Sequence, residues 1–515
     1  MAGQACGKMQ KQIDILTLFI YTHFERFDDG MEKKLLRKGK FSSFIRLFAA
    51  VMFLLPLFRG SACADMNDDF LSQCMKLAES RDRRLVVAYQ QIQLAEIRSV
   101  RAARAFFPQI MLQATTSKGK TALATDTGSS FSDEEYNSQS YGVRAAQTIY
   151  EGYRTKGMYK YETMMVDAAR FNYTKTREEL FARIKLAYYE YLTLNQEYKA
   201  LGKAYDIVDK LFVKVKNEYK AKAISDLDMV EAENFRDKVS DMLNASKINL
   251  DFSIKKLLET VNIQSLDDIN AKVSAELPDD VPEITFSLQD LFSFVLTNNL
   301  DVQTAKVQAM MSEMKIKINR SKVIPKFYIE GFYGKSGEAF TTEPLELTTA
   351  WSMIARMSWS LWGNSLEASY SQDNTDPSTI VDASKRIDTT TYDVKFSLLD
   401  DMSFFVDTKE SAVGLEQANA DYVDTLKQRR LEVEKAYNDY LNSLSSARTL
   451  RKEITLRERK LDLMKKRNDL YEVPTVSLMQ ETWQYAEAIG SYTRTVYQNH
   501  ASVTEMERLT LMPLR

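Results

Sequence analysis

Two acidic side chains are spaced so that they could act together chemically. Asp228 and Glu231 follow a break in a helical pattern and stand three residues apart, so their carboxylates lie on one helix face. Carboxylates grouped in this way attract cations. The dipole at a helix start also favours acidic residues, so a purely structural role stays open as the alternative.

The composition argues against catalysis and against nucleic acid as a partner. The 515 residues include 2 histidines and 3 cysteines, too few for most metal sites and catalytic triads. Segment 331–336 imitates a phosphate-binding loop, but it has two residues between its glycines where the motif requires four. The 69 Lys and Arg residues are balanced by 71 Asp and Glu residues. We therefore expect a protein that is not an enzyme, with no cofactor and no metal.

The N-terminal segment has the pattern of an export signal. A basic stretch opens residues 31–64, and an apolar run follows over 47–58, too short to cross a bilayer as a helix. A small-residue motif then ends at Ala64, which is typical of a bacterial secretory signal peptide cleaved before Asp65. We expect residues 1–30 to be an extension upstream of the true start, without fold of its own.

Cleavage at this site determines which cysteines and histidines remain in the exported chain. Lipidation of Cys63 is the alternative to cleavage after it, although the preceding residues fit the lipidation motif poorly. The exported chain keeps one cysteine, Cys74, so no internal disulfide is expected even in an oxidising compartment. Its one histidine, His500, lies in a polar stretch, and we expect it to be solvated.

The exported chain is predicted to be an internal twofold repeat. Pro108 and Pro325 each end a helical pattern and begin an alternating one. In both halves the order is helix, proline, strands, a very long helix, a short break and another helix. We assign residues 65–280 to the first repeat and 281–515 to the second.

Five segments alternate apolar with polar residues, which fits either a half-buried sheet or a membrane barrel. They are 109–118, 139–149, 325–334, 350–362 and 390–400. An even number must cross a membrane, because the flanking helices return to one side. We favour 350–362 as the fourth crossing, because Trp351 and Trp359 lie near its ends; 390–400 is the alternative. The polar stretch 371–390 is expected to be a loop.

The rest of the chain is predicted to form long helical hairpins. No proline interrupts residues 153–219, and apolar residues there recur in strict three-four alternation, which is a coiled-coil pattern. The hairpins are expected over 153–260 and 403–510. Their breaks, at 222–226 and 472–477, should lie together at the end far from the strands.

These features together resemble the TolC-type outer-membrane efflux proteins. The resemblance is carried by segments 85–88, 101–108, 146–152 and 223–232. It implies a mainly helical fold with a small transmembrane β part. A homotrimer would share a twelve-stranded barrel, four strands from each copy, and the coiled-coil-like helices would form a periplasmic tunnel. It also implies location in the outer membrane of a Gram-negative type bacterium.

The function implied by the resemblance is passive export, as the outer channel of a tripartite efflux pump or a type I secretion system. The implied partners are two further copies, a periplasmic adaptor protein, an inner-membrane transporter and outer-membrane lipid. A periplasmic coiled-coil scaffold without a pore is the alternative. Asp228 and Glu231 are the aperture candidates, with Gln480 and Trp483 at the matching second-repeat positions. Candidate adaptor contacts are Ala223, Ile224, Ser225, Asp226, Val473, Pro474, Thr475, Val476 and Ser477.

Overall fold

The computed structural model describes residues 66–124, 131–265, 283–340, 344–375, 387–399, 402–470 and 472–514. Residues 66–515 form one compact unit. The predicted signal peptide and its cleavage site at Ala64 and Asp65 lie outside the described residues.

The chain alternates helices with strands in two successive series. The first series is α3 (Met66–Arg81), α4 (Arg83–Arg104), β1 (Gln109–Ala124), β2 (Phe131–Tyr150), α5 (Arg154–Lys220) and α6 (Asp226–Val261). The second is α7 (Leu288–Asn298), α8 (Leu300–Arg320), the short 3-10 helix η3 (Ser321–Val323), β3 (Lys326–Phe340), β4 (Thr348–Leu361), β5 (Asn364–Thr375), β6 (Ile387–Ser397), α9 (Ser403–Asp469) and α10 (Thr475–Thr510).

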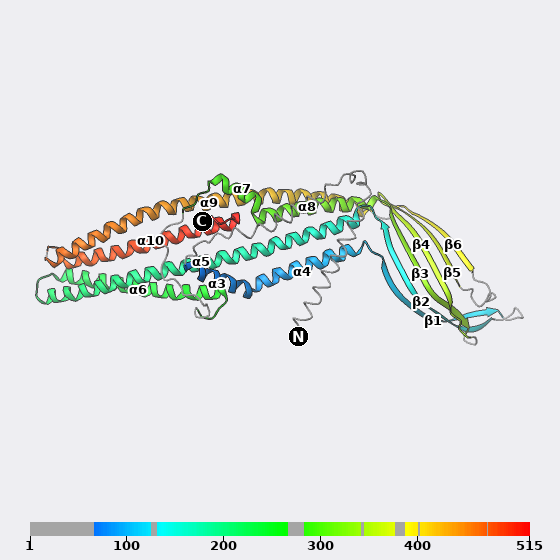
Figure 1. The fold of residues 1–515 in the computed structure, drawn as a ribbon, viewed down its shortest axis with the longest axis horizontal. Helices are drawn as coiled ribbons and strands as arrows, with labels where there is room; N and C mark the ends of the chain where they lie inside the picture. Colours follow the sequence, from blue (N-terminus) through cyan, green and yellow to red (C-terminus); the bar gives the residue numbers. More distant parts are fainter. Residues whose placement is uncertain are drawn as a thin grey trace, which may run out of the picture. The chain divides into compact units, whose positions relative to one another are not determined.

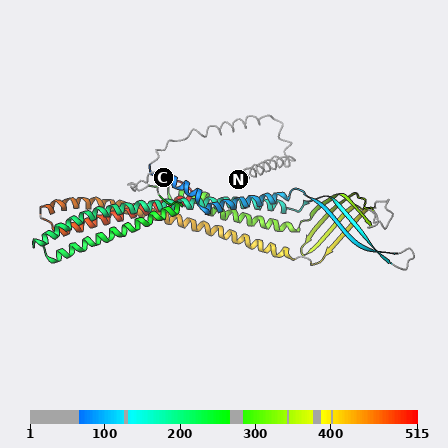
Figure 2. The same cartoon turned by 90° about the horizontal axis from the view of Figure 1, so that it is seen from below.

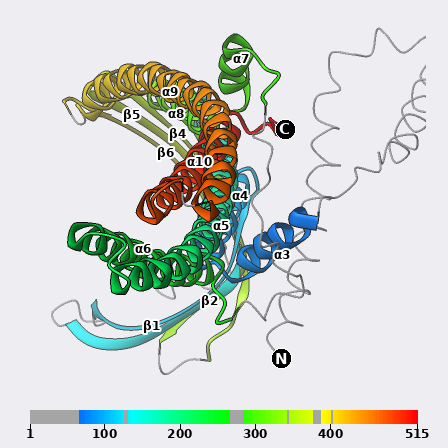
Figure 3. The same cartoon turned by 90° about the vertical axis from the view of Figure 1, so that its left-hand side faces the viewer.

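Two helices of unusual length connect the sheet to the far end of the unit. α5 and α9 have 67 residues each, which corresponds to about 100 Å at 1.5 Å per residue. α6 and α10, of 36 residues each, return along them (Figure 1). Seen from the turns, the four helices form a curved row in the order α9, α10, α5, α6 (Figure 3). Among the described helices, none is both long and apolar enough to cross a membrane.

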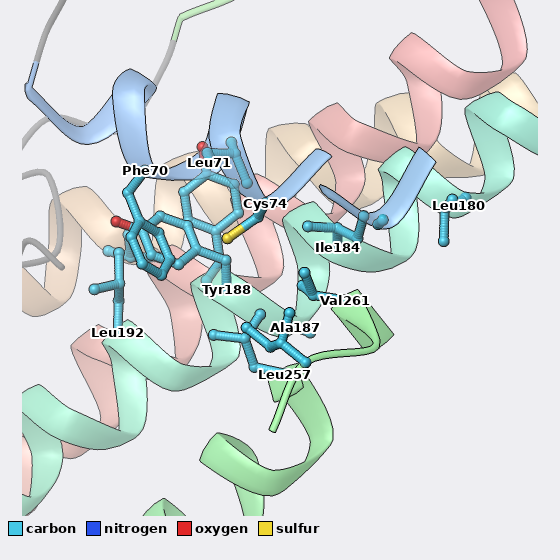
Figure 4. Close-up of a cluster of buried hydrophobic side chains, with 14 of the residues drawn as sticks. Phe70, Leu71, Cys74, Leu180, Ile184, Ala187, Tyr188, Leu192, Leu257 and Val261 are labelled. Atoms are coloured by element: carbon cyan, nitrogen blue, oxygen red, sulfur yellow. The ribbon is translucent and has the colours of Figure 1, made fainter. Parts of the chain in front are cut away.

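The main helical core lies where α3 packs on α5. Phe70 and Cys74 of α3 contact Tyr188 and Leu192 of α5, and all four side chains are buried (Figure 4). The expectation that His500 is solvated is wrong. Its side chain is 2% exposed and stacks on Tyr189 with 4.2 Å between ring centroids. The reason is that α10 packs against both α9 and α5, so even its polar residues face neighbouring helices.

An acidic residue in this packing layer gives a stability prediction. Burial raises the pKa of Glu197, and Arg494, with its nitrogen 3.6 Å from the carboxylate, offsets this only in part. A carboxyl whose pKa is higher in the folded than in the unfolded state destabilises the protein fully at pH values above the folded-state pKa. It has no such effect at pH values below the unfolded-state pKa. We therefore expect Glu197→Gln to raise the unfolding temperature slightly at pH about 8 and not at pH about 4. Thermal unfolding of the purified variant and wild type at both pH values tests this, and an equal gain at both would contradict it.

The sheet contains six described strands, and this corrects the prediction of four. The strands are antiparallel and lie in chain order, β1 to β6 (Figure 2). Segments 350–362 and 390–400 are not alternatives: both are strands, and β5 lies between them and pairs with both. β5 was not predicted: its last residues, 371–375, fall in the stretch expected to be a loop, and before them only Leu366, Ala368 and Tyr370 alternate with polar residues.

The sheet has one apolar and one polar face. The register brings apolar residues of all six strands to the same face: Ile110, Leu112, Val143, Ala145, Phe327, Ile329, Met353, Ala355, Met357, Leu366, Ala368, Val394 and Phe396. On the other face Arg144 forms an ion pair with Glu330, which also accepts a hydrogen bond of 2.9 Å from the Tyr328 hydroxyl. Each strand therefore separates an apolar environment from a polar one.

Candidate functional site at the helical tip

The turn between α5 and α6 is a compact helix-to-helix connection. Lys222 adopts a left-handed backbone conformation with φ of 60°, a position where glycine is more usual. The Ala223 amide donates back to the Glu218 carbonyl at 2.9 Å, which closes the last turn of α5. Ser225 then caps α6, with its hydroxyl accepting from the Asp228 amide at 3.2 Å. The turn lies at the predicted break 222–226, although lysine occupies the position where glycine is usual.

The turn between α9 and α10 is shorter than predicted. Pro474 is the N-cap of α10, so the helix starts at Thr475, inside the expected break 472–477. Proline fits here because an extended residue before a helix needs no amide donor. The Asn468 side chain donates to the Val473 carbonyl at 3.0 Å and to the Thr475 hydroxyl at 3.1 Å. These two hydrogen bonds fix the turn.

A chain of polar contacts joins the two turns at the end of the helices far from the sheet (Figure 1). The Lys214 ammonium of α5 donates to the Asn468 amide oxygen at 2.7 Å. The Thr475 hydroxyl donates to the Glu218 carboxylate at 3.2 Å. Asn468 and Thr475 are buried, so these hydrogen bonds are shielded from water and fix the relative position of the turns.

The aperture candidates differ in their surroundings. The Asp228 carboxylate accepts hydrogen bonds from the Ser225 amide at 3.1 Å and hydroxyl at 2.8 Å, and these contacts lower its pKa. Asp228 therefore caps the helix and stays charged in mildly acidic medium. Glu231 is exposed one turn later, as is Gln480 on α10, whereas Trp483 packs on a buried cluster of α5, α6 and α10 that includes Val208.

Sequence and fold comparisons both show similarity to outer-membrane efflux proteins. Residues 74–240 match the model of the outer membrane efflux protein family. The resemblance to outer-membrane efflux proteins is confirmed.

Solved outer-membrane channels share this fold along nearly the whole chain. The CmeC outer membrane channel of Campylobacter jejuni is 14% identical, with a TM-score of 0.67 over 89% of this chain and 91% of its own. The outer membrane protein VceC of Vibrio cholerae is 11% identical, with a TM-score of 0.65 over 88% and 100%. The Neisseria gonorrhoeae MtrE channel is 12% identical, with a TM-score of 0.62 over 87% and 90%. No curated protein sequence matches.

Near the tip, this efflux-protein fold holds an ionic cluster around one buried acid that the sequence did not single out. Glu481 of α10 is 3% exposed and forms ion pairs with Lys460 and with Arg457, the latter at 3.4 Å. Arg457 also contacts Glu453 at 2.9 Å and donates to Gln484 at 2.8 Å. The cluster connects α9 to α10 just above the turns. Glu481 is buried because α10 packs against both α9 and α5, which the polar sequence around it does not indicate.

The two outer helices of the row expose apolar side chains in this efflux-protein fold. On α9 and its C-cap, Leu456, Leu463 and Leu470 recur every seven residues, and each is at least 61% exposed. On α6, Leu227 and Val230 are exposed near the turn. A seven-residue spacing of leucines is the pattern of a helix seam, so each flank of the row has the surface expected for another helix.

Proposed function

We propose that the chain is a homotrimeric channel of the outer membrane that gives passive export from the periplasm, or from an inner-membrane transporter, to the exterior. The observation that carries this proposal is the sheet, which has an apolar face and in which the outermost described strands, β1 and β6, each pair with one described strand. Lipid cannot bond the amides and carbonyls of an open edge, so such a sheet must be closed by further copies. The relatives with this fold are channels by name.

The helical part fits the same assembly. Within one copy, α6 and α9 lie at opposite ends of the curved row (Figure 3), and both expose apolar side chains. Threefold rotation would place α6 of one copy against α9 of the next and close the rows into a periplasmic tunnel. Each half of the internal repeat would then supply one helical hairpin to the tunnel wall.

The partners follow from the position of the tip. A passive tunnel supplies no energy, so an inner-membrane transporter must do so, as part of a tripartite pump or a type I secretion system. A periplasmic adaptor would contact the turns, at residues 223–226 and 473–477, of which Ala223, Ser225, Asp226 and Pro474 are exposed. Outer-membrane lipid would surround the apolar face of the sheet.

Cell fractionation tests the proposal against the alternative, a periplasmic scaffold without a pore. We expect the full chain in the outer-membrane fraction, as an oligomer that resists detergent on gels until it is heated. Reconstituted into planar bilayers, it should form stepwise conducting channels. Recovery in the soluble periplasmic fraction without channel activity would overturn the proposal.

The acidic residues at the tip give a prediction for the reconstituted channel. In a trimer, Asp228 and Glu231 would form a ring of carboxylates around one axis, which binds cations and repels itself when constricted. We expect Asp228→Ala with Glu231→Ala to weaken block by divalent cations several-fold without loss of the trimer. Single-channel currents with and without divalent cations measure this.

A matched control separates the ring from helix capping. Asp290 forms the same capping box in α7, where its carboxylate accepts from the Ser287 amide at 3.0 Å and hydroxyl at 2.7 Å. Asp290→Ala should therefore remove an equivalent cap and leave cation block unchanged. If divalent cations block the Asp228→Ala, Glu231→Ala channel as strongly as the wild type, the ring has no part in the mechanism. Both acids would then serve only as favourable charges at the start of the helix.

A further inference from the structure

The sheet consists of three hairpins, β1–β2, β3–β4 and β5–β6, and the third one determines how wide the channel is. We infer that three copies close a barrel of eighteen strands, in which β6 of one copy pairs with β1 of the next. The inference rests on the proposed homotrimer and departs from the twelve strands that the family resemblance implies. Six strands per copy come from the hydrogen-bonded order β1 to β6.

The first argument is that β5 and β6 continue the apolar face without a break. The register across β4, β5 and β6 aligns three apolar rows: Trp359, Leu366 and Phe396; Met357, Ala368 and Val394; Ala355, Tyr370 and Tyr392. In β6, Tyr392 and Val394 are more than 70% exposed in the isolated chain. A hairpin that left the lipid would carry this apolar face into water, at a cost that grows with the exposed area.

The second argument is that the opposite face of the hairpin is charged. Glu367 of β5 lies directly opposite Lys395 of β6, and Ser369 lies opposite Asp393. Arg356 of β4 is on the same face, opposite Ser369. Alternating apolar and charged positions match a wall with lipid outside and water inside. The hairpin therefore has the same two faces as the rest of the sheet.

The third argument is that β4 has no free edge to offer another copy. Only Trp362 and Gly363 separate β4 from β5, both with positive φ, of 46° and 94°, as in the tight turns of β-hairpins. Asn364, the first residue of β5, accepts a hydrogen bond of 3.0 Å from the Leu399 amide, just past the end of β6. The start of β5 and the end of β6 are thus fixed side by side, and β6 leads directly to α9.

The two remaining edges are complementary. β1 runs away from α4 and β6 runs towards α9, so the two would meet antiparallel across a seam between copies. A register that places Ile110 opposite Phe396 also pairs two further apolar positions and sets Lys118 opposite Asp388. Cross-strand pairs of these kinds stabilise antiparallel sheets. β6 has 11 residues, enough for one crossing of a bilayer as a tilted strand.

The strand number decides the width of the outer duct. Barrel diameter grows roughly linearly with strand number, so eighteen strands give a barrel about 1.5 times as wide as twelve. Barrels of 16–18 strands leave an aqueous channel in other membrane proteins. The exit through the membrane would then be wide and water-filled, and the helical tip would be the narrow part of the path.

Cysteine cross-linking in the full-length trimer tests the seam. Gln113→Cys on β1 with Asp393→Cys on β6, treated with a short bismaleimide, should give covalent dimers and trimers on denaturing gels. The matched control is Gln113→Cys with Ser352→Cys on β4, which should give none. Each single variant and the wild type, with its buried Cys74, should also stay monomeric.

The outcomes separate the two proposals. Cross-links from β4 and none from β6 would show a twelve-stranded barrel with a displaced hairpin and overturn the inference. No cross-link with either pair in a protein that is trimeric by mass would overturn the β6–β1 seam as well. If the protein is not trimeric by mass, the proposed function fails, whatever the cross-links show. In a polymer-exclusion measurement from the outer mouth, this channel should admit larger polymers than a twelve-stranded channel does. An equal size limit would also contradict the inference.

Discussion

Replacing Gly334 by Val should abolish assembly of the protein in the outer membrane. Gly334 of β3 lies directly opposite Gly142 of β2, so two residues without side chains meet in the middle of the sheet. A Cβ at 334 would lie 2.2 Å from the Tyr141 carbonyl oxygen and 2.6 Å from the Gly142 Cα. Both are backbone atoms of a paired strand and cannot move without breaking the ladder. We therefore expect β2 and β3 to separate and the heat-sensitive oligomer to disappear.

A second glycine of the same strand provides the control. A Cβ at Gly331 would meet only the Ser352 carbonyl oxygen, at 3.8 Å, which is an ordinary contact distance. Gly331→Ala should therefore assemble at wild-type level. Both variants are compared by the amount of oligomer in outer-membrane fractions. Normal assembly of Gly334→Val would show that the two strands are not in this register.

Asn299→Ala should destabilise the helical part by about 2–4 kcal/mol. Asn299 is 3% exposed and joins α7, α8 and the end of α10. Its amide oxygen accepts from the amides of Asp301 at 3.0 Å and Val302 at 3.1 Å, which caps α8. Its amide nitrogen donates to the Leu509 carbonyl at 2.8 Å. Alanine would leave these three backbone groups, two of them in buried hydrogen bonds, without these partners.

The control for Asn299→Ala is a helix cap of the same type that lacks the hydrogen bond to another helix. Asp82 caps α4 by accepting from the Arg84 amide at 2.6 Å and the Leu85 amide at 3.4 Å. Asp82→Ala should cost about 1 kcal/mol, the usual value for a lost cap. Chemical denaturation of both variants followed by helix content tests the difference. Equal losses would mean that the bond to Leu509 contributes nothing.

Local sequence signals were enough to find the long helices. The stretch 153–219 lacks proline and repeats apolar residues in heptads, and α5 runs over Arg154–Lys220. Pro108 and Pro325 each precede a strand, β1 and β3, because proline ends a helix and suits a strand start. Such features depend on neighbouring residues alone, so the sequence predicts them well.

Features that depend on distant partners were missed. β5 was missed because its alternation is limited to Leu366, Ala368 and Tyr370 and polar residues follow; pairing with β4 and β6 holds the rest of the strand in the sheet. His500 is buried because α10 lies between two other helices, which the polar sequence around it does not indicate. At the tip, the capping role of Asp228 follows from the local Ser225 pattern. The contacts of Lys214 and Glu218 with the other turn bridge more than 250 positions and leave no local signal.

The buried position of Cys74 has a chemical consequence. Burial raises the pKa of its thiol to about 12. At neutral pH very little of it is then in the thiolate form, which is the form that attacks disulfides, maleimides and oxidants. In the folded protein Cys74 therefore exchanges slowly with other thiols even in an oxidising compartment, whereas a chain in which α3 has left α5 exposes this thiol at ordinary reactivity. The rate at which a thiol-reactive dye labels Cys74 would report how often α3 detaches from the helical core.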